Sequence, residues 1–367
     1  MILVDNLFKF LNKNKVNFFT GVPDSILKKT KNYLETKNKK IHITASNEGS
    51  AIATAIGYHL ATKKIPCVYM QNSGLGNAIN PLISIAHKKV YSIPMVLMIG
   101  WRGVPGSKDE PQHLAKGAIT IKLLKLLGIK CCILNSEKDF IKLKKLLDFS
   151  KKNNSIIACL IKKNILNAKI AVNKTKNKKA ILREDFIKLL LENIDNKTNI
   201  ISTTGFASRE LHQARKKYSL GKGKDFYMVG GMGHSSMVSL GSSIFTKRQT
   251  ICLDGDGSAM MHMGSLASIG NFANKNYKHI ILNNYGHESV GGQKTYSEKV
   301  NFKLVSKGAG YKNYFYLNKN KEIKNIIKKL ILSNGPSLLE VDIAQKSMFN
   351  LLRPKNFYKI KKNFMSK

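Results

Sequence analysis

Residues 253–286 read LDGDGSAMMHMGSLASIGNFANKNYKHIILNNYG. A short apolar run ends at Asp254, and the turn Gly255-Asp256-Gly257 leads into a segment with helical spacing. A second apolar run then ends in the pair Asn283-Asn284, after the 25 positions of residues 258–282. That spacing fits one helix and one strand of a βαβ unit. The Asp and the Asn pair are therefore predicted to meet at the carboxyl ends of neighbouring parallel strands, where open α/β sheets bind ligands.

The residue types at this predicted edge suit a magnesium ion bound to a diphosphate. Mg²⁺ prefers about six oxygen ligands, and a carboxylate, an amide oxygen, a carbonyl and two phosphate oxygens nearly complete that set. The glycines let the backbone approach the phosphates, and a helix beginning near Ser258 offers unpaired N–H groups to their charge. A lone GDG turn would be weak evidence. The Asn pair at this distance makes the pattern specific.

The stretch resembles the diphosphate- and metal-binding motif of thiamine-diphosphate enzymes, in which GDG is followed by NN at this distance. The resemblance implies Mg²⁺ ligands at Asp256, Asn284 and the carbonyl of Gly286. It also implies contacts with thiamine diphosphate at Gly255, Asp256, Gly257, Ser258 and Asn284.

The first half of the chain holds a candidate for the catalytic glutamate of that family, which hydrogen-bonds N1′ of the cofactor's pyrimidine ring. The segment ITASNEGSAIATAIGYHLAT (residues 43–62) resembles the family's motif and places Glu48 at the start of a small-residue helix. The alternative is that Glu48 only favours the positive end of the helix, which Ser46 or Asn47 caps.

Two further segments resemble parts of the cofactor site. In FYMVGGMGHSSMVSLG (residues 226–241), Met232 matches the bulky residue that folds the cofactor and brings its two rings together. The alternative for Met232 is a filler of an irregular core. Gly205, in STTGFASREL (residues 202–211), resembles the loop that closes over the cofactor.

Other segments narrow the resemblance to the phosphonopyruvate decarboxylase family, and they include FFTGVPDSILKK (18–29), MQNSGLGNAINPL (70–82), GWRGVPGSKDEPQHLAKG (100–117) and GHESVGGQKT (286–295). The family implies decarboxylation of 3-phosphonopyruvate to phosphonoacetaldehyde and CO₂, in phosphonate biosynthesis. Sulfopyruvate decarboxylase, which gives sulfoacetaldehyde, is the alternative. Lys294 stands where the family pattern has Pro, which puts the local loop shape in doubt.

Several side chains are candidates for substrate binding or proton transfer. A phosphonate dianion pairs naturally with guanidinium and ammonium groups, so Arg102 and Lys294 are candidate anchors. The alternative for Arg102 is a structural salt bridge, and the alternative for Lys294 is a solvated surface position. His113 and His287 are candidate acids or bases, each with the alternative of a satisfied polar group in a loop.

The pattern of apolar runs predicts two α/β domains. Short β-rich runs alternate with helical segments in both halves, which favours parallel sheets flanked by helices. We expect a pyrimidine-binding domain over residues 1–165, a polar linker over 166–180 and a diphosphate-binding domain over 181–367. Residues 355–367 have the composition of a basic tail.

Composition excludes other classes of protein. The net charge is +40, but only six of the 62 basic residues are Arg and the Lys residues are spread throughout, so specific nucleic-acid binding is not expected. The five Cys residues form no C-x-x-C pair, and no apolar run is long enough to cross a membrane. We expect a cytoplasmic enzyme. The resemblance implies a homodimer or higher homo-oligomer with sites between subunits.

Overall fold

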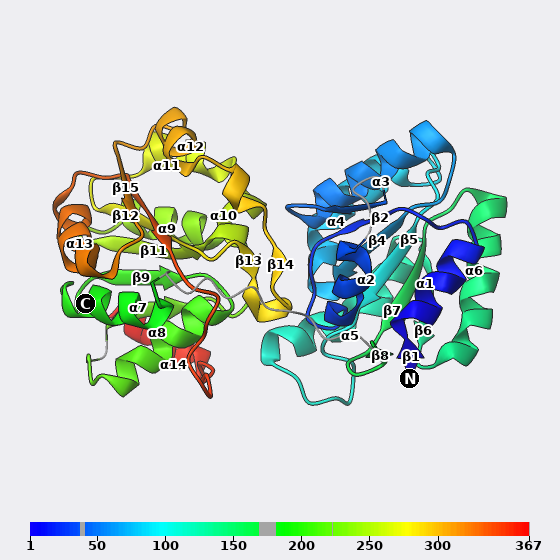
Figure 1. The fold of residues 1–367 in the computed structure, drawn as a ribbon, viewed down its shortest axis with the longest axis horizontal. Helices are drawn as coiled ribbons and strands as arrows, with labels where there is room; N and C mark the ends of the chain where they lie inside the picture. Colours follow the sequence, from blue (N-terminus) through cyan, green and yellow to red (C-terminus); the bar gives the residue numbers. More distant parts are fainter. Residues whose placement is uncertain (37–40, 169–180, 222, 367) are drawn as a thin grey trace. The chain divides into compact units, whose positions relative to one another are not determined.

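The computed structural model describes residues 1–36, 41–168, 181–221 and 223–366. It divides into two compact units, Met1–Asn173 and Lys174–Lys367 (Figure 1). The linker expected over residues 166–180 begins with strand β8 (Leu166–Asn167), which pairs in parallel with β1 (Ile2–Leu3). Its remaining part, 169–180, lies outside the described residues.

The first unit is built on a six-stranded sheet whose described strands all pair in parallel, in the order β3-β2-β4-β5-β7-β6. Its strands are β2 (Phe19–Gly21), β3 (His42–Thr44), β4 (Cys67–Gln71), β5 (Val96–Gly100), β6 (Lys130–Leu134) and β7 (Ile157–Ile161). Its helices are α1 (Val4–Lys13), η1 (Lys28–Thr30), α2 (Lys31–Glu35), α3 (Glu48–Thr62), η2 (Asn72–Gly74), α4 (Leu75–Pro81), the π-helical turn η3 (Leu82–Ala86), α5 (Pro111–Leu126), η4 (Glu137–Asp139) and α6 (Phe140–Asn153).

The second unit has a sheet of the same kind, in the order β10-β9-β11-β12-β16-β15. Its strands are β9 (Asn199–Ser202), β10 (Lys224–Tyr227), β11 (Thr250–Gly255), β12 (Tyr277–Asn283), β15 (Asn313–Leu317), β16 (Ser337–Asp342) and the hairpin pair β13 (Gly286–His287) and β14 (Gln293–Lys294). Its helices are α7 (Arg183–Glu192), α8 (Phe206–Lys217), α9 (Ser235–Ile244), α10 (Asp256–Met261), α11 (Ser265–Phe272), η5 (Glu288–Val290), η6 (Ser297–Lys299), α12 (Phe302–Gly308), η7 (Asn320–Glu322), α13 (Ile323–Leu332) and α14 (Phe357–Met365).

The two sheets share one topology. Numbered along the chain within each sheet, the strands of both units run in the order 2-1-3-4-6-5. The order reverses between the first and third strands, which are β2 and β4 in one unit and β9 and β11 in the other. Ligands of open parallel sheets bind outside the carboxyl ends of the strands at this reversal. The topology therefore marks one edge in each unit as a candidate site.

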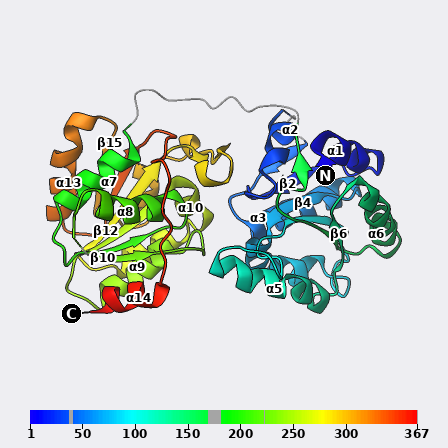
Figure 2. The ribbon, with the colours of Figure 1, turned by 90° about the horizontal axis from the view of Figure 1, so that it is seen from below.

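Helices cover both faces of each sheet (Figure 1 and Figure 2). Alternate residues of the buried strands face opposite sides, as in β5, where Met98 packs with α1 and α6 and Ile99 packs with α3 and α4. In the second unit, one core lies under α7, α8 and α13, and the other under α9, α11 and α12. The chain thus folds as two α/β domains, each a parallel sheet flanked by helices, as the fold prediction states.

Two local predictions were wrong. The spacing after the GDG turn predicts one helix over residues 258–271, but the structure has two helices, α10 and α11, because His262 has the non-helical dihedrals φ −133° and ψ 53°. The segment expected as a basic tail forms α14, which packs beside β10 (Figure 2). Its Asn363 Nδ2 donates to the carbonyl of Gly223 at 3.0 Å.

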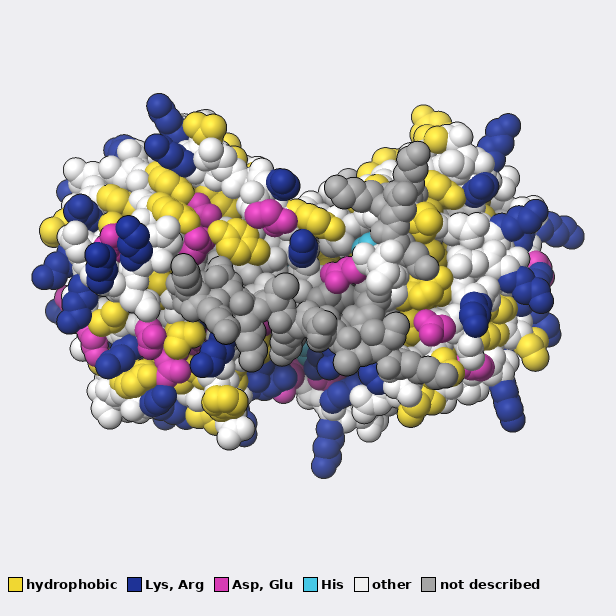
Figure 3. All heavy atoms as spheres, viewed as in Figure 1, with side chains coloured by type: hydrophobic (Ala, Val, Ile, Leu, Met, Phe, Trp, Pro, Cys, Tyr) yellow, Lys and Arg dark blue, Asp and Glu magenta, His cyan; other side chains and the backbone are white. Residues whose placement is uncertain are grey.

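The charge is distributed as the sequence suggests. On the face seen in Figure 3, Lys and Arg side chains are spread over both units and gather in no single stripe. Among the described residues, no helix is both long and apolar enough to cross a bilayer.

Candidate active site

The GDG turn and the Asn pair lie at neighbouring strand ends, as predicted. Gly255, the last residue of β11, is opposite Leu282 in β12, so Asp256 and Asn283 follow at the same edge of the sheet. The hydroxyl of Ser297 lies 3.0 Å from Oδ2 of Asp256 and 2.8 Å from Oδ1 of Asn283. One hydroxyl group thus connects the two halves of the motif.

Asp256 lies at the GDG turn in an environment suited to a metal-binding carboxylate. Its carboxylate is buried, and within the described residues its side-chain partners are the hydroxyls of Thr295, at 2.5 Å, and Ser297. Burial raises the pKa of Asp256 to about 6. A buried carboxylate supported by neutral hydroxyls suits a hard divalent cation such as Mg²⁺.

Asn284 and Gly286 lie at the same edge of the sheet, after the end of β12. Oδ1 of Asn284 accepts a hydrogen bond of 3.1 Å from the N–H of Gly286, and its Nδ2 donates to Glu288 at 3.1 Å. Nε2 of Gln345 donates to the backbone carbonyl of Asn284 at 2.9 Å. Both residues are buried, and their oxygens are of the type that the implied metal requires.

The hydroxyl of Ser258 contacts two other segments and holds them beside the GDG turn. Its hydroxyl lies 2.9 Å from Oγ1 of Thr203, which follows β9, and accepts a hydrogen bond of 3.1 Å from the N–H of Gly233. Met232, the candidate that folds the cofactor, precedes Gly233 and is half-buried. The strand end, the Met232 turn and the GDG turn therefore lie together at the reversal point between β9 and β11.

Two glycines of the site occupy positions where a side chain would not fit. A Cβ at Gly257 would lie 2.6 Å from Cε1 of His287, so the imidazole lies directly against the GDG turn. Gly205 has a φ of +99°, which favours glycine, and a Cβ there would lie 3.3 Å from Oγ of Ser289. The loop at Gly205 thus lies beside the β13–β14 hairpin.

The hairpin holds the two remaining candidates of this unit. Burial lowers the pKa of His287 to about 4, so its imidazole is neutral near pH 7. Lys294 pairs with Gly286 in the antiparallel hairpin, and its side chain is exposed. Lys294 in place of the family's Pro is thus compatible with a regular hairpin. Its exposure matches the solvated alternative.

In the first unit, Glu48 and the cap of its helix are separate features. Asn47 caps α3, since its Oδ1 accepts a hydrogen bond of 2.8 Å from the N–H of Ser50. The Glu48 carboxylate is buried and accepts a hydrogen bond of 2.8 Å from Nδ2 of Asn77. A residue of α4 therefore holds the Glu48 carboxylate, while Asn47 caps the helix.

Arg102 forms the salt bridge that was its structural alternative. Its Nε donates to Oδ2 of Asp109 at 2.7 Å, and its Nη2 donates to Oδ1 of the same carboxylate. Its Nη1 donates to Oγ of Ser25 at 3.2 Å. The guanidinium thus lies at the carboxyl end of β5 with two of its nitrogens held by Asp109. His113 lies farther along, in the first turns of α5, and is half-buried.

Sequence reasoning missed a polar cluster at the same edge of the first sheet. Asp24 follows β2, is buried, and accepts hydrogen bonds from the N–H groups of Ile26 and Leu27, both at 3.1 Å, and from Nε2 of Gln71 at 2.5 Å. Burial raises its pKa. Asn72 joins this edge by accepting from the N–H of Arg102 at 3.1 Å. The signal in the sequence was a polar residue directly after each short apolar run.

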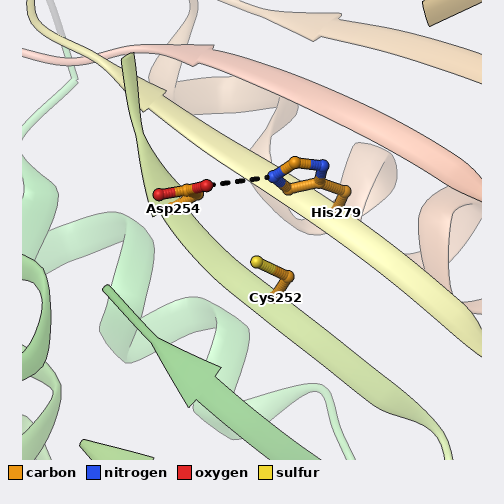
Figure 4. Close-up of side chains that lie close together, drawn as sticks. All are labelled: Cys252, Asp254 and His279. Carbon is orange, nitrogen blue, oxygen red and sulfur yellow. Dashed lines mark hydrogen bonds and ion pairs between the residues drawn. The ribbon is translucent and has the colours of Figure 1, made fainter. Parts of the chain in front are cut away.

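Three buried side chains lie together on the neighbouring strands β11 and β12, just before the GDG turn (Figure 4). Cys252 and Asp254 of β11 and His279 of β12 are buried with their potential ligand atoms within 4.8 Å of one another. Asp254 lies 3.4 Å from Nε2 of His279, whose Nδ1 lies 3.0 Å from the hydroxyl of Tyr311. Asp254 also accepts from the N–H of Gly255 at 2.9 Å. These hydrogen bonds satisfy the polar atoms of Asp254 and His279, and the bond from Gly255 to Asp254 stabilises the start of the GDG turn.

Comparison with known proteins agrees with this geometry. Residues 1–126 match the family described as thiamine pyrophosphate enzyme, N-terminal TPP binding domain, and residues 203–341 match its C-terminal TPP binding domain. The chain is 32% identical to a phosphonopyruvate decarboxylase of Streptomyces viridochromogenes, over 93% of this chain and 88% of that protein. It is 31% identical to one of Streptomyces hygroscopicus, over 97% and 91%. A sulfopyruvate decarboxylase of Methanosarcina acetivorans is 26% identical, over 82% and 81%. The chain therefore belongs to the phosphonopyruvate decarboxylase family of thiamine pyrophosphate enzymes.

Proposed function

We propose that this enzyme decarboxylates 3-phosphonopyruvate to phosphonoacetaldehyde and CO₂, using thiamine diphosphate and Mg²⁺, as a step in phosphonate biosynthesis. The observation that carries the proposal is the similarity to two phosphonopyruvate decarboxylases over nearly the whole length of each. The sulfopyruvate decarboxylase that spans most of the chain is less similar, at 26% identity. The phosphonate substrate is therefore preferred to the sulfonate.

The second unit would hold the diphosphate and the metal. Asp256, Asn284 and the carbonyl of Gly286 are the proposed Mg²⁺ ligands, since they supply the hard oxygen donors that the ion requires. The start of α10 places backbone N–H groups beside Gly255 and Gly257, which have no side chains, and this suits phosphate oxygens. The proposed contacts with the cofactor are Gly205, Met232, Gly255, Gly257 and Ser258.

When bound, thiamine diphosphate supplies a carbon nucleophile for the keto group and an electron sink for the departing carboxyl group. Glu48 is the group of this chain that would hold a proton at N1′ of the pyrimidine ring. The hydrogen bond from Asn77 fixes one of its carboxylate oxygens. Met232 would press against the cofactor and keep its two rings together.

Proton transfer to the product needs an acid in the site. His287 is our first candidate, because its imidazole lies against the GDG turn. Its neutral imidazole carries one N–H donor and one acceptor nitrogen, so it can hydrogen-bond both the reacting group and a neighbouring proton source. His113 is the second candidate, from the edge of the first unit.

The phosphonate group would be bound by Arg102. Asp109 holds its Nε and Nη2, which leaves the Nη1 side, near Ser25, as the donor that a substrate oxygen can share. The salt bridge fixes the guanidinium plane but does not occupy every N–H donor of Arg102. Arg is suited to this role because it presents five N–H groups in a fixed geometry.

We also propose a cytoplasmic homo-oligomer. Leu114, Ile119 and Ile121 of α5 are exposed at 40%, 54% and 39%, and apolar surface of this kind supports assembly. All five cysteines are free, three of them buried, which supports a reducing compartment.

The test is release of CO₂ from 3-phosphonopyruvate with phosphonoacetaldehyde trapped as product, with thiamine diphosphate and Mg²⁺ added together or singly. We expect turnover only with both. Asp256→Ala should lose cofactor retention at ordinary Mg²⁺ concentrations, while Asp185→Ala, an exposed carboxylate of the same unit, should retain it. Turnover without either addition, or normal retention by Asp256→Ala, would contradict the proposal.

A further inference from the structure

We propose that Arg183, Glu210 and Glu288 form a positioning relay that orients the side-chain amide of Asn284 for the metal ion. The inference rests on the proposed function, since it concerns the same Mg²⁺ site. It assigns a role to three side chains that do not touch the metal.

The relay is a continuous chain of charge-assisted hydrogen bonds. Nη1 of Arg183 donates to Oε1 of Glu210 at 2.9 Å, and its Nη2 donates to Oε2 of Glu288 at 2.7 Å. Oε2 of Glu288 also accepts from Nδ2 of Asn284 at 3.1 Å. Arg183 and Glu210 are buried, and the Glu288 side chain is 16% exposed. One guanidinium therefore reaches the proposed metal ligand through a single carboxylate.

The chemistry of the carboxylate sets the orientation of the amide. An ionised Glu288 can only accept hydrogen bonds, so Asn284 must turn its NH₂ group toward it. The carbonyl oxygen of the amide is then directed away from Glu288, where it accepts from the N–H of Gly286 at 3.1 Å. A flipped amide would place two acceptor oxygens against each other and offer nitrogen, which is a poor Mg²⁺ ligand.

Charge gives a second reason to connect the relay with a cation. Two carboxylates and one guanidinium carry a net charge of −1 if all are ionised, and burying unbalanced charge costs stability. Within the described residues, Oε2 of the buried Glu210 has no hydrogen-bond partner. The unbalanced negative charge of this group destabilises the fold by itself. A divalent cation bound at Asn284, next to Glu288, would offset that charge.

The relay also anchors the segment that carries the site. Arg183 begins α7, Glu210 lies on α8, and Glu288 lies in η5 between β13 and β14. The N–H of Met348 donates to Oε1 of Glu210 at 3.2 Å. Two helices of the core therefore hold the hairpin that contributes Gly286 and His287.

A second buried ion pair of the same unit provides a matched control. Nε and Nη2 of Arg215 donate to Asp225 at 2.9 and 3.0 Å, and the hydroxyl of Tyr227 donates to the same carboxylate at 2.8 Å. This group joins α8 to β10 and includes none of the proposed ligands. Breaking it should destabilise the fold without a specific effect on the metal.

The experiment is calorimetric titration of thiamine diphosphate at a series of Mg²⁺ concentrations, which needs no turnover. Glu288→Met removes the acceptor and leaves Arg183 and Glu210 as a neutral pair. We expect the Mg²⁺ concentration for half-maximal cofactor binding to rise about tenfold, as for other groups that orient metal ligands. Glu288→Gln, whose amide oxygen can still accept from Asn284, should recover most of the loss. Asp225→Asn should leave the Mg²⁺ requirement unchanged.

An unchanged Mg²⁺ requirement in Glu288→Met would overturn the relay, as would an equal rise in Asp225→Asn. If Glu288→Met does not fold, Arg183→Lys is the second test, because Lys keeps the charge but cannot bridge two carboxylates in the same way. A smaller rise is expected, and no rise would overturn the proposal. Failure of the unaltered enzyme to bind thiamine diphosphate with Mg²⁺ would instead contradict the proposed function.

Discussion

Nδ2 of Asn77 donates a hydrogen bond of 2.8 Å to Oε2 of Glu48, which links α4 to the first residue of α3. The other carboxylate oxygen lies against Gly74, where a Cβ would be 2.2 Å from Oε1. The Glu48 carboxylate is therefore held between an amide donor and a bare backbone. Its position depends on Asn77 and Gly74 as well as on its own helix.

Glu48→Gln should nearly abolish turnover while leaving cofactor binding intact. The substitution preserves the shape of the side chain but removes the acid–base group, and such groups contribute about 10²–10⁴-fold to rates. The measurement is CO₂ release together with calorimetric binding of thiamine diphosphate. Undiminished turnover would remove Glu48 from the mechanism.

Gly74→Ala should reduce turnover because the added methyl group displaces the Glu48 carboxylate. A displacement near 1 Å in a catalytic group costs about 10²-fold in rate. Gly76→Ala is the control, since among the described residues a Cβ there meets no atom within 4 Å. The two variants are compared by kcat at saturating cofactor. Equal activities would show that the carboxylate does not need the space above Gly74.

Arg102→Ala should raise KM for a phosphonate substrate far more than for pyruvate. A hydrogen bond to a charged group is worth about 1.5–3 kcal/mol, which corresponds to about tenfold or more in KM. Asp109→Asn keeps the shape of the partner and weakens the salt bridge, so it serves as the comparison. If Arg102 has only a structural role, both variants should lower the melting temperature and leave the ratio of the two KM values unchanged.

The stability of the first unit should fall as the pH drops from about 6.5 to about 4, partly through His42. Burial lowers the pKa of His42 to about 4, and the usual value is about 6.5. Below the usual value the unfolded chain takes up a proton that the folded chain resists, so stability present near neutral pH is lost in this range. His42→Gln, which can keep a hydrogen bond to Tyr69, should show a flatter profile.

The measurement for His42 is the free energy of unfolding in urea at several pH values for both proteins. One pKa unit corresponds to about 1.4 kcal/mol. The ring keeps some contact with solvent, so we expect a difference of about 1–2 kcal/mol between pH 7 and pH 4. Parallel profiles for the two proteins would contradict the account.

The sequence predicts the features that short-range chemistry determines. The apolar run at residues 67–71 predicts a strand, and the segment after Asn47 predicts a helix over residues 48–62. The strand β4 and the helix α3 have these bounds, because the apolar run and the cap at Asn47 define them locally. The strand β2 was missed because a run of three residues carries too little periodicity. The break between α10 and α11 was missed because His262 gives no sign in the sequence of its non-helical backbone.

The candidate site divides in the same way. The spacing of Asp256 and Asn284 follows from one βαβ unit, so their shared edge was predictable. The relay was not, since Arg183 and Glu288 are 105 positions apart and meet only in the folded unit. The salt bridge of Arg102 was named as an alternative, but only the structure shows that Asp109 is the partner.

The substrate of the enzyme is determined by comparing kcat/KM for 3-phosphonopyruvate, sulfopyruvate and pyruvate, measured side by side with thiamine diphosphate and Mg²⁺. We expect a preference for 3-phosphonopyruvate of about tenfold or more, since a correctly bound charged group is worth about 1.5–3 kcal/mol. A preference for sulfopyruvate or pyruvate would contradict the proposed substrate.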